Sequence, residues 1–266
     1  MRQRKKRSAI KQEAADKKAV SSVITTIIIS SVLLIILVIA SFVSTNILDM
    51  QMASTEFEQA KTNMGLLDSV IQDVALRPGA GGYVQFNERT GGIGINETDN
   101  EMKIDAIANG TSTNLKNWSK LISLAYHAGH QVSGAATNIT GSTKLNLTMS
   151  EPLSFLRVEA SPGIWIKLDY NRVRTASMGN LSANNGVYDF YDITFLRLTK
   201  GNIMAGGSGT VNVRVQNQGI NTSSKVYENG VTITAQLNGG NPVKCISTAN
   251  RTVVMITEIA ITVAIG

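Results

Sequence analysis

The sequence predicts an α+β protein: a long N-terminal hydrophobic and amphipathic helix followed by an all-β antiparallel, sandwich-like head. Three observations support this fold class. Residues 20–43 contain no charged residue, histidine or proline, residues 46–77 space their apolar side chains as in a helix, and after residue 80 apolar and polar residues alternate instead. We expect a basic leader over residues 1–19, a transmembrane and stem helix over 20–77, and a β-domain outside the membrane over 79–266.

The uncharged run of 24 residues is long enough to cross a membrane as a helix. At about 1.5 Å per residue it spans about 36 Å, which exceeds the hydrocarbon core of a bilayer. A removable secretory signal usually has a shorter apolar region of about 7–15 residues. Such a signal, cut within "ASFVS" at residues 40–44, is the alternative interpretation of this run.

The basic charge of the chain lies in its first residues. Residues 1–19 carry eight basic side chains against two acidic ones, and the whole chain has a net charge of +6, so the rest is neutral. The composition therefore gives no indication of nucleic-acid binding. A basic segment before an apolar helix stays on the cytoplasmic side under the positive-inside rule. We expect a single-pass membrane protein with a cytoplasmic N-terminus and an exported remainder.

The segment after the apolar run is predicted to be an amphipathic stem helix. Beginning at Met50, its apolar residues recur at steps of three and four, which places them on one edge of a helix. That edge needs a partner, either a neighbouring copy of the chain or, after Gly65 in particular, the chain's own head. The predicted packing residues are Ala53, Phe57, Ala60, Met64, Leu67, Ile71 and Val74.

The remainder is predicted to form about nine short antiparallel strands separated by glycine-rich and asparagine-rich turns. Residues 84–95 fit a strand, a Thr-Gly-Gly turn and a second strand, with Val84 and Phe86 on one face. The clearest alternation is found over 211–216 and 253–265. Further strands are expected over 120–126, 153–160, 164–174, 188–198, 209–217 and 230–237. A head of this size can bury a core, so we expect it to fold without the helix.

Eight asparagines stand in Asn-x-Ser/Thr sequences with no proline between, which makes them glycosylation candidates on an exported surface. The single cysteine, Cys245, has no second cysteine with which to form an internal disulfide. The eight asparagines are Asn96, Asn109, Asn117, Asn138, Asn146, Asn180, Asn221 and Asn250.

These parts resemble a known family. A basic leader ending in Lys-Ala, the following "VSSVITT", a helix that continues as a stem and a sequon-rich β head are similar to archaeal type IV pilin-like proteins with a class III signal peptide. Two segments, "VALRPGAGGYVQFNERTGGIGI" at 74–95 and "GIWIKLDYNRVR" at 163–174, resemble hairpins that follow the stem in such proteins. The resemblance covers most of the chain in layout but only short stretches in motif.

The resemblance implies that a prepilin peptidase removes the leader. It places the cut between Ala19 and Val20, with a cut between Lys18 and Ala19 as the alternative. Lys17 and Lys18 would hold the leader in the cytoplasm. Bacterial type IV pilins carry a glutamate at the fifth mature position, where this chain has Ile24, and archaeal members commonly lack that glutamate as well.

The sequence predicts no enzymatic activity, no cofactor and no metal. The only histidines, His127 and His130, stand in "YHAGHQ", whose glycine favours a turn over a helical face that would bring both rings to one zinc ion. The chain has no Gly-x-Ser-x-Gly motif and no phosphate-binding loop.

Two functions are consistent with these expectations. The first is a structural subunit of an archaeal type IV pilus-like surface filament, a homo-oligomer built by the pilus assembly machinery through the hydrophobic helix, with a glycosylated head for adhesion or surface contact. The second is a non-filamentous membrane-anchored protein that binds the cell-surface layer or a carbohydrate. In both, the chain begins as a membrane protein, and in the first it ends in an extracellular filament.

Overall fold

A computed structural model of the chain describes residues 2–184, 186–203, 209–228, 230–247 and 251–266. Within these ranges, side chains are described from Val23 onward, apart from those of residues 245–247. The described chain contains one helix, α1 (Arg2–Ala75), and fifteen strands in three sheets. It divides into two compact units, Met1–Met52 and Ala53–Gly266.

The first unit is helical throughout its described residues. Its backbone is already helical in the basic leader, so α1 begins before the expected start at residue 20. Every large apolar side chain from Val23 to Met52 is exposed. By length and composition, α1 is the one helix of the described chain that can cross a membrane.

Polar side chains inside the apolar run are satisfied by the helix itself. The hydroxyls of Ser30 and Ser31 both donate to the carbonyl oxygen of Ile27, at 3.0 and 2.8 Å. Thr45 donates in the same way to the carbonyl oxygen of Phe42, at 2.9 Å. Because lipid offers no water as a partner, bonds of this kind make serine and threonine compatible with a membrane-spanning helix.

The second unit combines the end of α1 with three mostly antiparallel sheets, which confirms the α+β class. The six-stranded sheet has the order β1 (Gly81–Glu88), β12 (Gly209–Tyr227), β15 (Thr252–Ile265), β11 (Gly186–Ile203), β10 (Val173–Ala183) and β7 (Asn146–Leu147). The five-stranded sheet has the order β2 (Gly92–Glu97), β5 (Ile122–His127), β9 (Trp165–Asp169), β8 (Phe155–Glu159) and β6 (Thr137–Thr140). The four-stranded sheet has the order β14 (Val243–Ser247), β13 (Val231–Leu237), β3 (Met102–Ala108) and β4 (Thr111–Trp118).

Both predicted hairpins are wrong, although their strands exist. β1 pairs with β12 and β2 pairs with β5, so the chain passes from one sheet to another at the Thr-Gly-Gly turn. In the same way, β9 belongs to the five-stranded sheet and β10 to the six-stranded sheet. A turn signal shows where the chain changes direction, but it does not determine which strand becomes the hydrogen-bonding partner.

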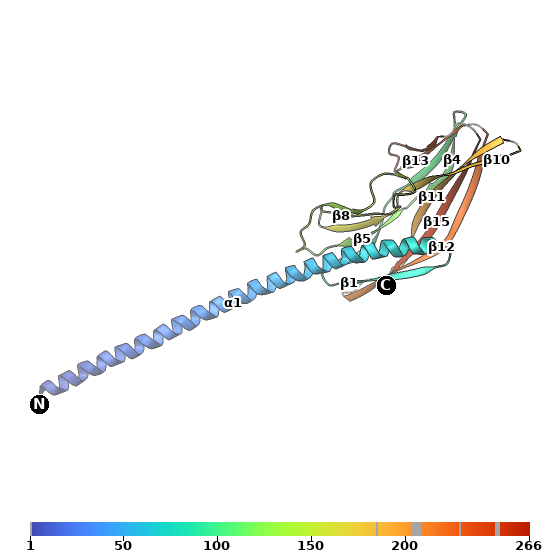
Figure 1. Ribbon diagram of the computed structural model, residues 1–266. Helices are drawn as coiled ribbons and strands as arrows, with labels where there is room; N and C mark the ends of the chain where they lie inside the picture. The colour runs from blue at the N-terminus through green and yellow to red at the C-terminus, as the bar shows by residue number, and fades with distance from the viewer. Residues whose placement is uncertain (1, 185, 204–208, 229, 248–250) are drawn as a thin grey trace. The chain divides into compact units, whose positions relative to one another are not determined.

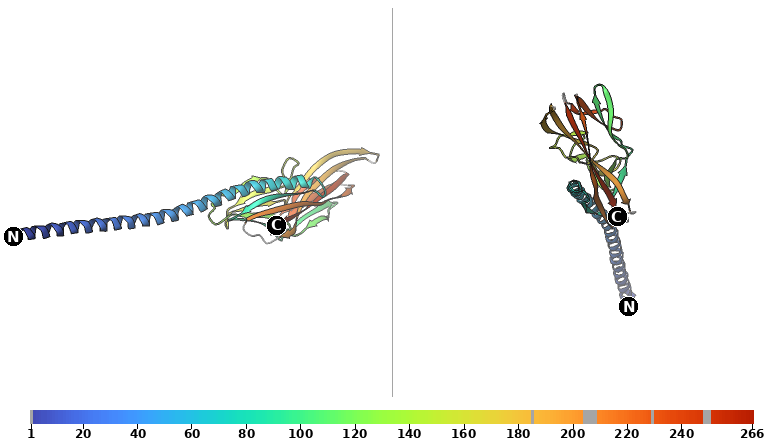
Figure 2. Two further views of the ribbon diagram at one scale, coloured as in Figure 1. Left: turned by 90° about the horizontal axis from the view of Figure 1, so that it is seen from below. Right: turned by 90° about the vertical axis from the view of Figure 1, so that its right-hand side faces the viewer.

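The six-stranded sheet buries one face at one end of its strands and the opposite face at the other end. In β15, Val254 and Ile256 belong to one hydrophobic cluster and Ile259 and Ile261 to another. Side chains alternate along a strand, and β15 pairs with β11 without a break here, so the two clusters lie on opposite faces. The head is therefore sandwich-like but has three sheets. Figure 1 shows β15 between β11 and β12, and Figure 2 shows β12 and β15, in orange and red, from two other directions.

α1 ends at Ala75, where a buried asparagine of β12 caps it. The side-chain amide of Asn217 donates to the carbonyl oxygens of Val74, at 3.0 Å, and Ala75, at 3.2 Å. These carbonyls belong to the last turn and have no partner within the helix. The backbone of Asn217 also exchanges hydrogen bonds with Gly79 and Ala80, which fixes the chain as it leaves the helix.

Candidate functional site

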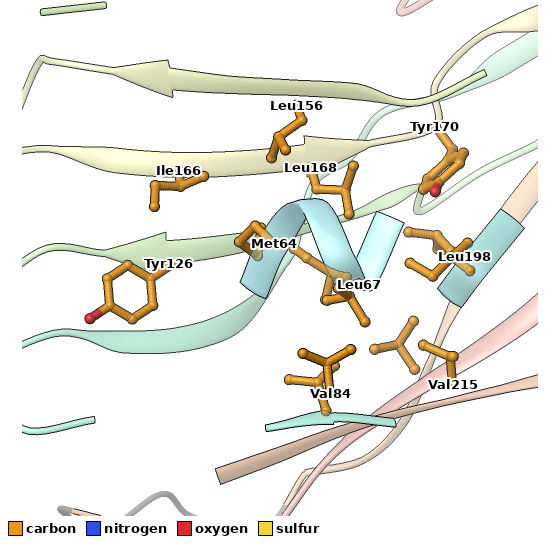
Figure 3. Close-up of a cluster of buried hydrophobic side chains, with 14 of the residues drawn as sticks. Met64, Leu67, Val84, Tyr126, Leu156, Ile166, Leu168, Tyr170, Leu198 and Val215 are labelled. Atoms are coloured by element: carbon orange, nitrogen blue, oxygen red, sulfur yellow. The ribbon is translucent and has the colours of Figure 1, made fainter. Parts of the chain in front are cut away.

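The predicted packing stripe of the stem is buried in the chain's own head. All seven residues, from Ala53 to Val74, are at most 6% exposed. From Phe57 onward they belong to one core cluster with residues of the six- and five-stranded sheets. Figure 3 shows Met64 and Leu67 between Ile166 and Leu168 on one side and Val84 and Val215 on the other. The sequence left two partners for this stripe, a neighbouring copy or the chain's own head. In the structure the stripe packs against the head, and this contact begins well before Gly65.

Two acidic residues on the flanks of the stripe also hold the stem to the head. Glu56 accepts hydrogen bonds from the backbone N–H groups of Arg89, at 2.9 Å, and Gly91, at 3.1 Å. It also accepts from the backbone N–H and the hydroxyl of Thr90, at 3.0 and 2.7 Å, and from the phenol of Tyr126, at 3.0 Å. One carboxylate thus holds the whole turn between β1 and β2 against the helix.

This set of donors favours the charged form of Glu56. Burial alone would raise the pKa of Glu56, but the backbone N–H groups and the two hydroxyls outweigh it and lower the pKa below its ordinary value. Burial and the hydrogen bond to Glu56 raise the pKa of Tyr126, so the phenol keeps its proton and remains a donor.

Asp68 forms the second attachment, which is buried. Its carboxylate accepts hydrogen bonds from the hydroxyl of Ser154, at 2.9 Å, and from the phenol of Tyr170. Burial, followed by the nearby Asp68 charge, raises the pKa of Tyr170 well above its ordinary value. Neither Glu56 nor Asp68 belongs to the predicted apolar stripe, and only the loops and strands that reach them show their role.

The first unit exposes the large apolar side chains of α1. We call residues 23–52 the apolar surface, because all their large apolar side chains are exposed in the chain. Met50, the first residue of the predicted stripe, belongs to it and is 53% exposed. The side chains of the predicted processing site, Lys17, Lys18, Ala19 and Val20, lie outside the described residues, and their backbone is helical.

The glycosylation candidates differ in their surroundings. Asn146 is half-buried, and its side chain bonds to the hydroxyl of Thr175 and the carbonyl oxygen of Lys244. Asn250 lies outside the described residues, as does the side chain of Cys245. The remaining six are exposed: Asn96, Asn109, Asn117, Asn138, Asn180 and Asn221.

The two histidines do not form a metal site with other ligands in the described part of the chain, where no group of three metal-ligating side chains is found. His127 is the last residue of β5, and its ring centre lies 6.4 Å from that of His130 and 4.4 Å from that of Trp165. His127 and Trp165 border a hollow of about 530 Å³ on the five-stranded sheet. We call this hollow the outer trough; its other residues are Gly92, Ile93, Gly94, Ile95, Asn96, Ala125 and Lys167.

The sequence does not predict the outer trough. Its patterns predict turn and strand positions for the glycines of β2 and a hairpin around Trp165. The trough forms because β2 pairs with β5 and β5 pairs with β9. No sequence pattern predicts these two pairings.

Comparison with known proteins adds no assignment. No protein-family model, curated protein or solved structure matches this chain.

Proposed function

We propose that the chain is a structural subunit of a type IV pilus-like surface filament, assembled through its N-terminal helix. The observation that carries this proposal is the division of α1. The apolar stripe within residues 53–75 is buried by the head, whereas every large apolar side chain over 23–52 is exposed in the part of the chain that the structure describes. An apolar helix of this length is stable in lipid, or among other apolar helices, but not in water.

The same helix serves two environments in this proposal. Before assembly, the bilayer covers the apolar surface and the basic leader keeps the N-terminus in the cytoplasm. After a prepilin peptidase removes the leader, the helices of many copies replace the lipid around each other. Lipid tails are as apolar as the side chains themselves, so close packing of the helices rather than escape from water stabilises the assembly.

The attachment of the stem is consistent with such a subunit. Glu56, Asp68 and Asn217 hold residues 53–75 to strands and turns of the head, so the head retains its fold when the apolar surface changes environment. The second unit then acts as one body that each copy contributes to the outside of the filament.

The proposal is tested by shearing cells that produce the chain and examining the released extracellular filaments. We expect the chain in the filament fraction, and filaments visible by electron microscopy that disappear when the gene is deleted. Cells that produce and export the chain normally but yield no filament containing it would contradict the proposal.

One observation favours the second candidate, a membrane-anchored surface protein. The stem stripe is already covered by the head and is not free to form a seam between copies. For an anchored protein, we expect the processed chain in the membrane fraction, as a monomer or a small complex, after complete shearing.

A further inference from the structure

The outer trough has a floor that is almost free of side chains. The strand register aligns Gly92 of β2 with His127 of β5, and His127 with Trp165 of β9. The neighbouring row aligns Gly94 with Ala125. Paired residues of antiparallel strands point to the same face, so glycine and alanine form the floor while the two rings stand at one end. The hollow exists because these floor positions have little or no side chain.

The sides of the trough are held in place before any ligand arrives. The indole N–H of Trp165 donates to the carbonyl oxygen of Pro162, at 2.9 Å, and the ring packs against His127. Lys167, aligned with the floor residue Ala125, forms an ion pair with Glu159 at 2.6 Å. A fixed aromatic ring with amine and imidazole groups near it suits a ligand with apolar C–H faces and a hydroxylated edge. Sugar rings have this chemistry.

A glycosylation candidate stands at the other end of the trough. Asn96 follows Gly92 and Gly94 at alternate positions of β2, so all three are on the same face, and its side chain is exposed. Asn96 lies four positions after Gly92 along the strand, a distance of about 13 Å. A β-carbon built on Gly94 would meet nothing within 4 Å, so the path between them is open.

We propose that the outer trough holds the saccharide attached to Asn96 of the same chain. The inference rests on export of the head, which is part of the proposed function. In the attachment step, Nδ2 of Asn96 bonds to the anomeric carbon of a phosphate-activated sugar, and the bond between that carbon and the phosphate oxygen breaks. The electrons of the broken bond leave with the phosphate, and the proton lost from Nδ2 passes to water. The attached sugars extend over Gly94 and place a ring face against Trp165.

The first test is whether Trp165 senses the sugar. The full chain is purified in detergent from its native host, and the occupancy of Asn96 is measured by glycopeptide mass spectrometry. The only other tryptophan, Trp118, is buried in the other core cluster. We expect Asn96→Gln to increase acrylamide quenching of the tryptophan fluorescence, and expect no such increase when Trp165 is replaced by Phe. Asn109→Gln removes a sequon in the turn between β3 and β4 and serves as the matched control, with no change in quenching.

The second test is a thermal-unfolding cycle with Trp165→Ala and Asn96→Gln. Contact between ring and sugar predicts that Trp165→Ala lowers the melting temperature by about 2–4 °C more in the glycosylated chain than in the Asn96→Gln chain. When Trp165→Ala is combined with Asn109→Gln instead, the two changes in melting temperature should add. The proposal would be overturned if Asn96 carries a saccharide but Asn96→Gln leaves acrylamide quenching unchanged and its effect on the melting temperature adds to that of Trp165→Ala.

An unoccupied Asn96 in native material would also overturn it. Filament formation is scored separately by shearing, so filaments with an empty trough refute only this inference, and an occupied trough without filaments refutes only the proposed function.

Discussion

At the scale of single residues, buried polar contacts determine how the stem is held. Asp68 is 6% exposed and is the acceptor for two buried hydroxyls, those of Ser154 and Tyr170. Replacing Asp68 by Ala leaves both hydroxyls without this acceptor, and we expect the free energy of unfolding to fall by about 1–3 kcal/mol. Denaturant unfolding of the two chains measures the difference.

The control for Asp68 is Glu58→Ala. Glu58 is exposed and forms only a surface ion pair with Lys61, so its loss should change the free energy of unfolding by less than about 0.5 kcal/mol. Equal effects of the two substitutions would show that the Asp68 contacts do not stabilise the head.

Glu56 should make the stability of the head depend on pH. Its folded pKa lies below the ordinary value of 4.5, so its stabilisation is complete above that pH and is lost as the pH falls through the folded pKa. We expect wild type to be more stable than Glu56→Gln near neutral pH, and the difference to shrink on acidification below about pH 4.5. Unfolding curves of both chains across this range measure it. A difference that stays constant or grows in acid would exclude the carboxylate as the cause.

The sequence could not have predicted these residues as contacts. The helical period sorts side chains by face, and neither Glu56 nor Asp68 falls on the apolar stripe that it predicts. Their partners lie 33 to 102 residues away in turns and strands that the period does not locate. In the same way, Trp165 and Gly92 become neighbours only through β5, so the outer trough depends on strand order.

At the scale of elements, local patterns predicted which segments form helix or strand but not how the strands pair. Val84 and Phe86 are buried on one face as predicted, at 3% and 0% exposed. The last strand, β15, was predicted from its alternation, but its position in the middle of a sheet and its parallel pairing with β11 were not. Its long-range partners are selected by the packing of the whole head.

The stem helix offers a matched pair of substitutions. Ile71 is fully buried in the core cluster, whereas Leu66, on the same helix, is 54% exposed. We expect Ile71→Asp to destabilise the head by about 3–5 kcal/mol, because it places an unpaired charge in an apolar core. Leu66→Asp should change stability by at most about 0.5 kcal/mol. Thermal unfolding and protein levels in cells measure both.

The outcome for Ile71→Asp also separates two partners of the stem. A head that melts at its usual temperature, in cells that no longer form filaments, would mean that the stripe packs between copies of the chain. Lost stability with degraded protein is the result expected from the burial of Ile71 in the core cluster of the head.

At the scale of the whole molecule, the head includes part of the helix. The sequence suggested that a fragment from Gly79 would fold alone, but Phe57, Met64 and Ile71 belong to its core. We expect a fragment of residues 53–266 to be soluble, monomeric and β-rich, and a fragment of residues 79–266 to aggregate, because it exposes the surface that the stem covers. Size-exclusion chromatography and far-ultraviolet circular dichroism compare them. A well-folded 79–266 fragment would contradict the assigned boundary.

The central claim is that processing releases the N-terminal helix for assembly with other copies. N-terminal sequencing of the chain recovered from sheared extracellular filaments tests it most directly. The account predicts a mature chain that starts at Val20, or at Ala19 if the alternative cut is used. A chain that retains Met1, or one that starts beyond Phe42 and has therefore lost the apolar run, would contradict it.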